Sequence, residues 1–392
     1  MGKEYISLLL SLQTEGRWQK MKKTIFIVLT IIFLAACVQE QTIDTIKIGY
    51  IGPLTGTGSP YGIAELNAAR LAVGDSNSDG GINGKQVELV AEDGKCEGAA
   101  ATTAANKLIS VDKVNYILGG HCSTESLSIV PITEANHVFL MAGATGANDF
   151  TNSGKYAFRT YPPAKVLYGR LADYAYKKGT RTVVTLNEEK DWPQSVVESF
   201  KIRFTELGGK VLLSETYAPG TADFKTQLLK LAELNPDAVM ISVQGPDSAA
   251  QIIKQMNELN IDLQIYGDTL IVSTGVYDRT NGLLPESAVG STPHVDPDKS
   301  PETKAFYERY LSLHKDPGID PFVVMEGFDG ANIVLSLIKE CSDDVDCARS
   351  KLLNSNWSGV AGTFKFGEDG NPETKFVAIV SIIDGKQVFL EE

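Results

Sequence analysis

The stretch Gly119–Thr145, GGHCSTESLSIVPITEANHVFLMAGAT, decides the predicted fold, because it holds two successive units of a strand followed by a turn. The first turn follows an apolar run that ends at Leu118. A helix is expected next, over residues 125–134, with Ser123 or Thr124 available as its N-cap.

A second strand, over residues 137–141, leads into the turn of residues 142–145. In parallel α/β sheets, ligands bind beyond the carboxyl ends of the strands, where such turns meet. The free N–H groups of a helix start, together with the hydroxyls of Ser123 and Thr145, suit an anion such as a carboxylate. For either turn taken alone, helix capping by Ser123 or loop shaping by Thr145 is the simpler interpretation.

Length and composition are those of a globular protein of about two domains, with 392 residues of which 43% are hydrophobic and 22% charged. The formal net charge is -13, and no basic stripe is present in the sequence. Such a chain would repel a phosphate backbone, so nucleic acid is not an expected partner.

The N-terminal residues predict export. Two lysines after Met21 precede an apolar run over residues 25–36, which is too short to span a bilayer and suits a secretory signal. The run ends in LAAC, which resembles a bacterial lipobox and implies cleavage before Cys37 and lipid attachment to its sulfur. The expected segments are a mis-set start or extension (1–20), a lipoprotein signal peptide (21–36) and a tether (37–45), with an uncleaved membrane anchor as the alternative.

Four cysteines remain besides Cys37, and in an oxidising compartment they are expected to pair. We expect the disulfides Cys96–Cys122 and Cys341–Cys347, the first of which would tie the loop after the second strand to the first ligand turn. A metal site is the rival interpretation. With four histidines and no C-x-x-C pair in the sequence, we expect no metal.

Helices of about 10–18 residues alternate with short β-branched strands along the chain, which indicates parallel β-α-β units. The fold class is therefore α/β, with two doubly wound parallel-sheet lobes joined by a multi-crossing hinge around a cleft. The expected lobes are 46–161 with 293–372 (lobe 1) and 162–292 with 373–392 (lobe 2). The predicted strands are 46–51, 87–91, 114–118, 137–141, 156–160, 182–186, 210–217, 238–243, 264–267, 376–383 and 386–390; the predicted helices are 62–76, 99–111, 125–134, 166–178, 194–207, 222–234, 247–259, 301–314 and 324–339.

Catalysis is not predicted. The motifs G-x-S-x-G and H-E-x-x-H are absent from the sequence, and a disulfide-bonded Cys122 could not act as a nucleophile. The Gly-rich turn after the first strand lacks the G-K-[ST] ending of a phosphate loop. Its expected role is to carry Tyr61 on the ligand side, and no cofactor is expected.

Three residues at strand ends of the second half are candidate ligand contacts. Asp268 follows the strand of residues 264–267 and could neutralise an amine, although Asp at such a place often only forms a turn. Trp192 and Gln244 lie at equivalent strand ends. Trp192 could stack on a ligand or pack on the next helix.

Four segments together resemble a known family: KIGYIGPLTGTGSPYG, GGINGKQVELVAEDGKC, GGHCSTES and the GAT turn. They look like the periplasmic binding proteins of the leucine/isoleucine/valine class, which are receptors of ABC importers with the type I two-lobed fold. The resemblance covers about residues 46–390. It implies that the hydroxyl and N–H of Ser123 bind an amino-acid α-carboxylate, and that the Gly143 carbonyl and the Thr145 hydroxyl and N–H meet the same ligand.

The resemblance also implies that Asp268 pairs with the α-ammonium, that Tyr61 lines the cleft and that Cys96–Cys122 is the family's disulfide. Three residues depart from the family pattern: Trp192 replaces a usual Tyr, Gln244 a frequent aromatic residue and His121 an apolar one. These departures favour a polar or aromatic amino acid, or an amide-type ligand, over an aliphatic one. The predicted ligand set is Tyr61, His121, Ser123, Thr124, Gly143, Ala144, Thr145, Trp192, Gln244 and Asp268.

The predicted protein is a monomeric, lipid-anchored receptor that closes its lobes over an amino acid or similar zwitterion and delivers it to an ABC importer permease. It is expected in the periplasm or on the outer face of the cytoplasmic membrane, anchored through Cys37. Two alternatives remain open from the sequence. The chain could be a sensing module for a membrane receptor, or its ligand could be an amide or another small molecule that is not an amino acid.

Overall fold

The computed structural model describes residues 45–56, 58–293, 300–316, 318–373 and 377–391. By their mutual contacts, residues 45–392 form one compact unit, which is distinct from residues 1–44. The predicted signal peptide and the predicted lipidation site at Cys37 lie outside the described residues.

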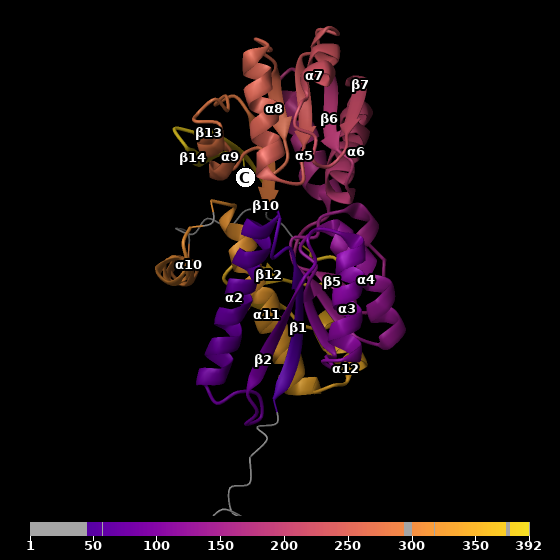
Figure 1. Ribbon diagram of the computed structural model, residues 1–392, viewed down its shortest axis with the longest axis vertical. Coiled ribbons are helices and arrows are strands. Elements are labelled where there is room, and N and C mark those ends of the chain that lie inside the picture. Colours follow the sequence, from indigo (N-terminus) through magenta and orange to yellow (C-terminus); the bar gives the residue numbers. More distant parts are fainter. Residues whose placement is uncertain (1–44, 57, 294–299, 317, 374–376, 392) are drawn as a thin grey trace, which may run out of the picture. The chain divides into compact units, whose positions relative to one another are not determined.

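The first sheet has five parallel strands in the order β2-β1-β3-β4-β5, drawn in the lower half of Figure 1. We call this sheet, with the helices that pack on it, lobe 1. Its strands are β1 (Ile46–Gly52), β2 (Val87–Asp93), β3 (Tyr116–Gly119), β4 (Phe139–Ala142) and β5 (Ala157–Arg159). Its helices are α2 (Ser59–Ser78), α3 (Gly98–Ser110), α4 (Ser123–Asn136), α11 (Pro321–Cys341) and α12 (Val345–Leu353), with a short 3-10 turn η1 (Asn148–Phe150).

Both faces of this sheet are apolar because helices cover both. Successive residues of a strand point to opposite faces, so Tyr116 and Leu118 of β3 join the core beneath α2 and α11, whereas Ile117 joins the core beneath α3 and α4. Helix α11 is long and apolar enough to cross a membrane by composition, but 78% of its apolar window is buried inside the protein. It is therefore a core helix of lobe 1.

The second sheet has seven strands in the order β14-β13-β10-β9-β8-β6-β7 and is drawn in the upper half of Figure 1. Five strands are parallel, and β13 and β14 add an antiparallel hairpin beside β10. We call this sheet and its helices lobe 2. Its strands are β6 (Thr182–Glu188), β7 (Lys210–Tyr217), β8 (Ala238–Ser242), β9 (Gln264–Gly267), β10 (Val289–Pro293), β13 (Val377–Ile383) and β14 (Lys386–Glu391), and its helices are α5 (Ala164–Lys177), α6 (Asp191–Glu206), α7 (Lys225–Ala232), α8 (Pro246–Glu258) and α9 (Thr274–Arg279).

Several local features differ from the expectation. Residues 289–293 form β10, which pairs with β9 and β13 of the second sheet, whereas no strand was predicted there and Pro293 was assigned to lobe 1. His137 has a left-handed backbone at the end of α4 and is not part of a strand. Cys122, not Ser123 or Thr124, is the N-cap of α4. The elements that were not predicted are β10, η1, α9, α12 and the hairpin of β11 (Trp357–Gly359) and β12 (Gly362–Phe364); α10 (Pro301–Leu313) was predicted.

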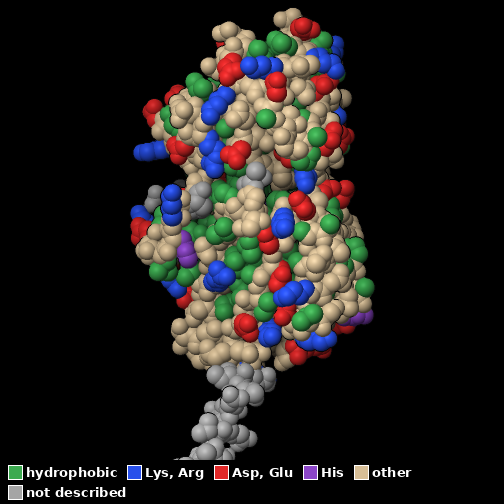
Figure 2. All heavy atoms as spheres, in the orientation of Figure 1, with side chains coloured by type: hydrophobic (Ala, Val, Ile, Leu, Met, Phe, Trp, Pro, Cys, Tyr) green, Lys and Arg blue, Asp and Glu red, His purple; other side chains and the backbone are tan. Residues whose placement is uncertain are grey.

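Charge is mixed on the visible surface. On the face drawn in Figure 2, Lys and Arg side chains are interspersed with Asp and Glu side chains over both lobes. The excess of acidic residues is therefore not gathered into one patch on that face.

Candidate ligand-binding site

A cavity of about 50 Å³ lies between the strand-end loops of the two lobes. A single water needs roughly 10–15 Å³ of such volume, so the cavity has room for only a few water molecules. A ligand the size of an amino acid therefore requires the surrounding side chains or lobes to move. The lining residues are Gly58, Tyr61, Cys96, His121, Cys122, Ser123, Ala144, Tyr161, Trp192, Gln244, Thr269, Leu270 and Val323.

The topology explains why the cavity forms here. In the first sheet the chain order reverses between β1 and β3, and in the second between β6 and β8. Loops leave a parallel sheet in opposite directions at such a point, which opens a crevice at the carboxyl ends of the strands. Tyr61 and His121 lie just beyond the reversal of lobe 1, and Trp192 and Gln244 just beyond that of lobe 2.

The start of α4 faces the cavity through Cys122 and Ser123. The first N–H groups of a helix have no partner within it, so the terminus offers donors to an anion. Glu125 takes up two neighbouring donors, because its carboxylate accepts the N–H of Cys122 and the N–H of Cys96, each at 3.0 Å. Burial raises the pKa of Glu125 to about 7 in spite of these bonds.

Among the hydrogen bonds of the described residues, the Ser123 hydroxyl donates none, so its proton is available to a ligand. Its Oγ accepts the N–H of Ala147 at 3.1 Å, and the residue is 1% exposed. Ala144 lines the cavity beside it. Ser123 therefore combines a hydroxyl donor with a helix terminus, as the sequence suggests for a carboxylate site.

Thr145 is fully buried and does not line the cavity. Its hydroxyl donates to the Gly120 carbonyl at 2.8 Å and lies 2.5 Å from Ser126 Oγ. Its N–H donates to the Gly143 carbonyl at 2.6 Å. The Thr145 hydroxyl thus ties the turn after β4 to the turn after β3, while the Thr145 N–H and the Gly143 carbonyl bond each other within the turn after β4.

Asp268 is also fully buried and is not a lining residue. One carboxylate oxygen accepts the Ser242 hydroxyl at 2.6 Å and the N–H of Val243 at 2.8 Å. The other accepts the N–H groups of Leu270 and Ile271 at 3.0 and 3.1 Å. Burial raises the pKa of Asp268 to about 6. Its predicted role as ammonium partner remains a prediction, since this structure engages both oxygens within lobe 2.

His121 forms a buried pair with Glu65, a residue that was not predicted for the site. Its Nδ1 lies 2.7 Å from Oε2 of Glu65 on α2, and the Tyr61 ring stacks on the imidazole at 5.7 Å between centroids. Gly143 makes room for the carboxylate, because a Cβ there would lie 1.8 Å from Glu65 Oε1.

Trp192 forms part of the cavity wall on the side of lobe 2. It lines the cavity and also packs edge-on against the rings of Tyr161 and Tyr168, at 5.8 and 5.6 Å between centroids. Both alternatives considered for Trp192 are thus compatible with its position.

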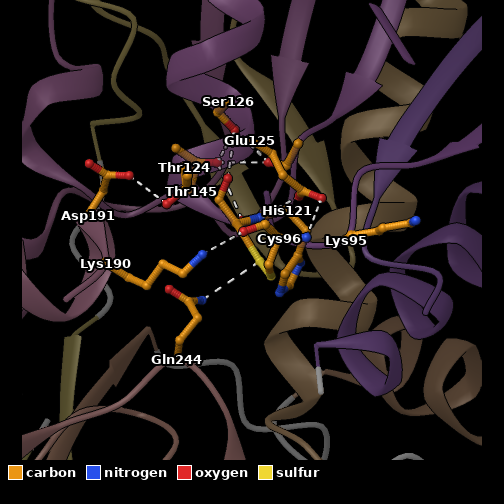
Figure 3. Close-up of a disulfide and its surroundings, with 12 residues drawn as sticks. Lys95, Cys96, His121, Thr124, Glu125, Ser126, Thr145, Lys190, Asp191 and Gln244 are labelled. Atoms are coloured by element: carbon orange, nitrogen blue, oxygen red, sulfur yellow. Dashed lines mark hydrogen bonds between the residues drawn. A yellow bond between two sulfur atoms is a disulfide. The ribbon is translucent and has the colours of Figure 1, made fainter. Parts of the chain in front are cut away.

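Polar contacts join the two lobes around the cavity, as Figure 3 shows. Thr124 Oγ1 donates to Asp191 Oδ2 at 2.5 Å, and Lys190 Nζ donates to the Cys96 carbonyl at 3.2 Å. Gln244 Nε2 lies 3.7 Å from Cys122 Sγ. These bonds describe a state in which the lobes are in contact at the site.

Both expected disulfides, Cys96–Cys122 and Cys341–Cys347, are formed, which confirms the predicted pairing. The first lies at the cavity wall. Within the described ranges, no group of three or more His, Cys, Asp or Glu side chains could hold a metal ion.

The structure brings six of the ten predicted ligand residues to the cavity wall. Thr124, Gly143, Thr145 and Asp268 do not line it. Tyr161, Thr269 and Leu270 were missed, although each follows a predicted strand and its place at a strand end could have indicated it. Val323 and Glu65 lie on helices, and no local signal marks them. The six predicted lining residues are Tyr61, His121, Ser123, Ala144, Trp192 and Gln244.

A family model for periplasmic binding proteins matches residues 45–387. The chain belongs to the periplasmic binding proteins. This match confirms the family expected from the four sequence segments.

Two relatives of this periplasmic binding protein span most of its length. The leucine-, isoleucine-, valine-, threonine- and alanine-binding protein of Pseudomonas aeruginosa is 23% identical over 333 residues, which are 84% of this chain and 87% of the relative. The Leu/Ile/Val-binding protein homolog 2 of Brucella abortus is 25% identical over 363 residues, which are 90% and 94% of the two chains. These relatives are binding proteins and not enzymes.

Solved structures show the same two-lobed α/β fold. A leucine binding protein of Thermotoga maritima has a TM-score of 0.80 at 26% identity, covering 88% of this chain and 97% of its own. A branched-chain amino acid substrate binding protein of Streptococcus pneumoniae in complex with isoleucine has a TM-score of 0.80 at 22% identity, covering 89% of this chain and 100% of its own. The predicted type I fold class is thereby confirmed.

Proposed function

We propose that this periplasmic binding protein is a receptor that encloses a small amino acid or amino-acid-like zwitterion in the cavity and delivers it to an ABC importer. One observation carries the proposal: the start of α4, with Ser123, faces a cavity at the reversal points of both sheets. The names of the Pseudomonas and Brucella relatives agree with an amino-acid ligand.

The ligand carboxylate would dock on lobe 1. Ser123 lies at the cavity wall at the start of α4, so its hydroxyl and the first N–H groups of the helix would be the donors, and the helix dipole favours a negative charge there. Closure of lobe 2 would then bring Trp192 and Gln244 onto the ligand and exclude water. A ligand that contacts both lobes shifts the open–closed equilibrium by its differential affinity for the closed form.

The anchoring belongs to the same proposal. A lipid on Cys37 would hold the protein, as a monomer, on the outer face of the cytoplasmic membrane, or the protein would lie in the periplasm. Mass spectrometry of Cys37 after expression in a bacterium that processes lipoproteins would show the lipid adduct, and a Cys37→Ser variant would release the protein from the membrane fraction.

A thermal-shift screen of residues 38–392 against the standard amino acids and their amides tests the ligand class, because a specific ligand raises the melting temperature by mass action. Ser123→Ala is expected to weaken a hit roughly tenfold, the scale of one lost hydrogen bond to a charged group. Ser128→Ala, one turn further along α4 and bonded to the Thr124 carbonyl, is the matched control. Unchanged affinity in Ser123→Ala would remove the carboxylate site from the start of α4.

Aromatic carboxylates are a second candidate ligand class, because the rings of Tyr61, Tyr161 and Trp192 line the cavity. Such rings can stack on an aromatic ligand while Ser123 holds its carboxylate. Benzoate belongs in the same screen. A shift with benzoate and none with any amino acid would favour this class.

A further inference from the structure

His121 is a polar residue of the cavity wall with a ring nitrogen that is free to meet a ligand, as are the Ser123 hydroxyl and the buried Oε1 of Gln244. His121 is 9% exposed and lines the cavity, and its Nδ1 is engaged by Glu65 at 2.7 Å. Among the hydrogen bonds of the described residues, none involves its Nε2. Figure 3 shows His121 beside the disulfide, on the side of the site toward which Gln244 extends from lobe 2.

Glu65 acts as a positioning residue for this imidazole. A carboxylate partner places the proton on Nδ1, which leaves Nε2 as an acceptor in the neutral ring and as a donor in the protonated ring. Two contacts fix the position of the His121–Glu65 pair. The Tyr61 ring stacks on the imidazole, and the absence of a side chain at Gly143 leaves room for the Glu65 carboxylate.

Glu65 interacts electrostatically with two other buried acidic residues. Glu125 and Glu326 are buried on α4 and α11, and both act electrostatically on or with Glu65. Burial, and then Glu65, raise the pKa of Glu326 well above its usual range. A raised pKa keeps Glu326 protonated and uncharged, so the charge that a second carboxylate on the ligand would meet here is that of Glu65, whose carboxylate lies 2.7 Å from His121 Nδ1.

We propose that His121, positioned by Glu65, selects ligands whose side chain carries a neutral polar group, namely a carboxamide or a hydroxyl. This inference rests on the proposed function and specifies its substrate class. Both groups carry a donor and an acceptor, so they satisfy Nε2 in either protonation state of the ring. An aliphatic side chain would leave Nε2 unpaired in a closed cavity, and a site with an unpaired polar group rejects the apolar analogue.

Two series of amino acids of nearly equal shape test this proposal by calorimetry on residues 38–392. The series are asparagine, leucine and aspartate, and glutamine, methionine and glutamate. In at least one series, the amide is expected to bind roughly tenfold or more tightly than both the apolar and the acidic member. His121→Leu is expected to reduce the amide-to-apolar affinity ratio to about one or below, and Glu65→Gln, which keeps a partner for Nδ1, is expected to retain the preference.

The outcomes separate the inference from the proposed function. Leucine or methionine binding as tightly as the amide, or an acidic member binding most tightly, would overturn the inference while leaving an amino-acid receptor in place. If none of the six binds, the thermal-shift screen decides: a shift with serine or threonine but not with alanine or valine would support the hydroxyl form of the inference, a shift with aliphatic or acidic amino acids alone would overturn the inference, and no shift with any amino acid would contradict the proposed function as well. Since the wild-type ratios decide on their own, the test does not depend on correct folding of the His121→Leu variant.

Discussion

Gly146, in the turn after β4, lies against the indole of Trp192 from lobe 2. A Cβ added at Gly146 would come within 2.0 Å of a ring carbon of Trp192. Real Cβ atoms do not approach other atoms so closely, so the indole could keep its place only if the turn moved. A single residue without a side chain thus determines how near the two lobes approach at the cavity.

Gly146→Ala is therefore expected to weaken ligand binding by roughly tenfold, since overpacking of this size typically costs about 1–3 kcal/mol. Titration calorimetry with the ligand identified by the screen measures the change. Gly74→Ala is the matched control, because a Cβ there meets nothing within 4 Å. It should leave affinity unchanged and stabilise α2 by about 0.5–1 kcal/mol. Wild-type affinity in Gly146→Ala would show that the Trp192 ring does not lie against Gly146 in the bound state.

At the scale of helices and strands, the bounds of an element could be predicted best where an apolar run is followed directly by turn-forming residues. Strands β7 and β9 have the bounds that were predicted, because turn-forming residues mark their ends: Gly208 and Gly209 precede β7, Pro219 and Gly220 follow it, and β9 ends at Gly267 before Asp268. Strand β10 was missed, since VGSTP is short and carries Gly and Pro, and its strand form depends on pairing with β9 and β13.

The site follows the same rule. Residues just after a strand could be placed at the cavity because a parallel sheet gathers all its carboxyl ends at one edge. Glu65 and Val323 could not be placed, because the face that a helix turns to the site depends on packing between α2 and α11. Which hydroxyls are free and which are engaged, as Ser123 and Thr145 illustrate, also depends on contacts that the sequence does not reveal.

Asp329 of α11 links this helix to the β11–β12 hairpin and makes stability depend on pH. Its carboxylate accepts the N–H groups of Val360 and Ala361 at 2.9 and 2.7 Å, and burial raises its pKa to about 7 from a usual value of 3.8. Between these two values the folded protein holds a proton that the unfolded chain has lost. The contribution of Asp329 to stability is thus complete below about pH 4 and is lost as the pH rises through 7.

Asp329→Asn is expected to remove this part of the pH dependence. Relative to the variant, the wild type should lose unfolding free energy between pH 4 and pH 8, by about 1.4 kcal/mol for each unit by which the pKa is raised. Urea unfolding at pH 4.5, 6 and 8 measures the difference. Glu233→Gln, at an exposed position, is the control. A wild-type and an Asp329→Asn curve that stay parallel across this range would contradict the assignment.

In the whole molecule, the polar bonds between the lobes exist only while the lobes are in contact, so they contribute to closure and not to the stability of either lobe. Thr124 Oγ1 to Asp191 Oδ2, at 2.5 Å, joins the starts of α4 and α6. When the lobes separate, water replaces this bond, and its net contribution is that of one solvent-exchanged hydrogen bond, about 0.5–1.5 kcal/mol.

Thr124→Val removes this hydroxyl while nearly preserving side-chain volume, and it is expected to weaken ligand affinity roughly three- to tenfold. The loss should appear in the dissociation rate measured by stopped flow, because ligand leaves only after the lobes part, whereas the association rate should change little. Thr103→Val is the matched control, since Thr103 is exposed and its hydroxyl donates to the Ala99 carbonyl within α3. If Thr124→Val and Thr103→Val released ligand equally fast, the Thr124–Asp191 bond would have no part in holding the lobes closed, and closure would depend on the ligand and Trp192.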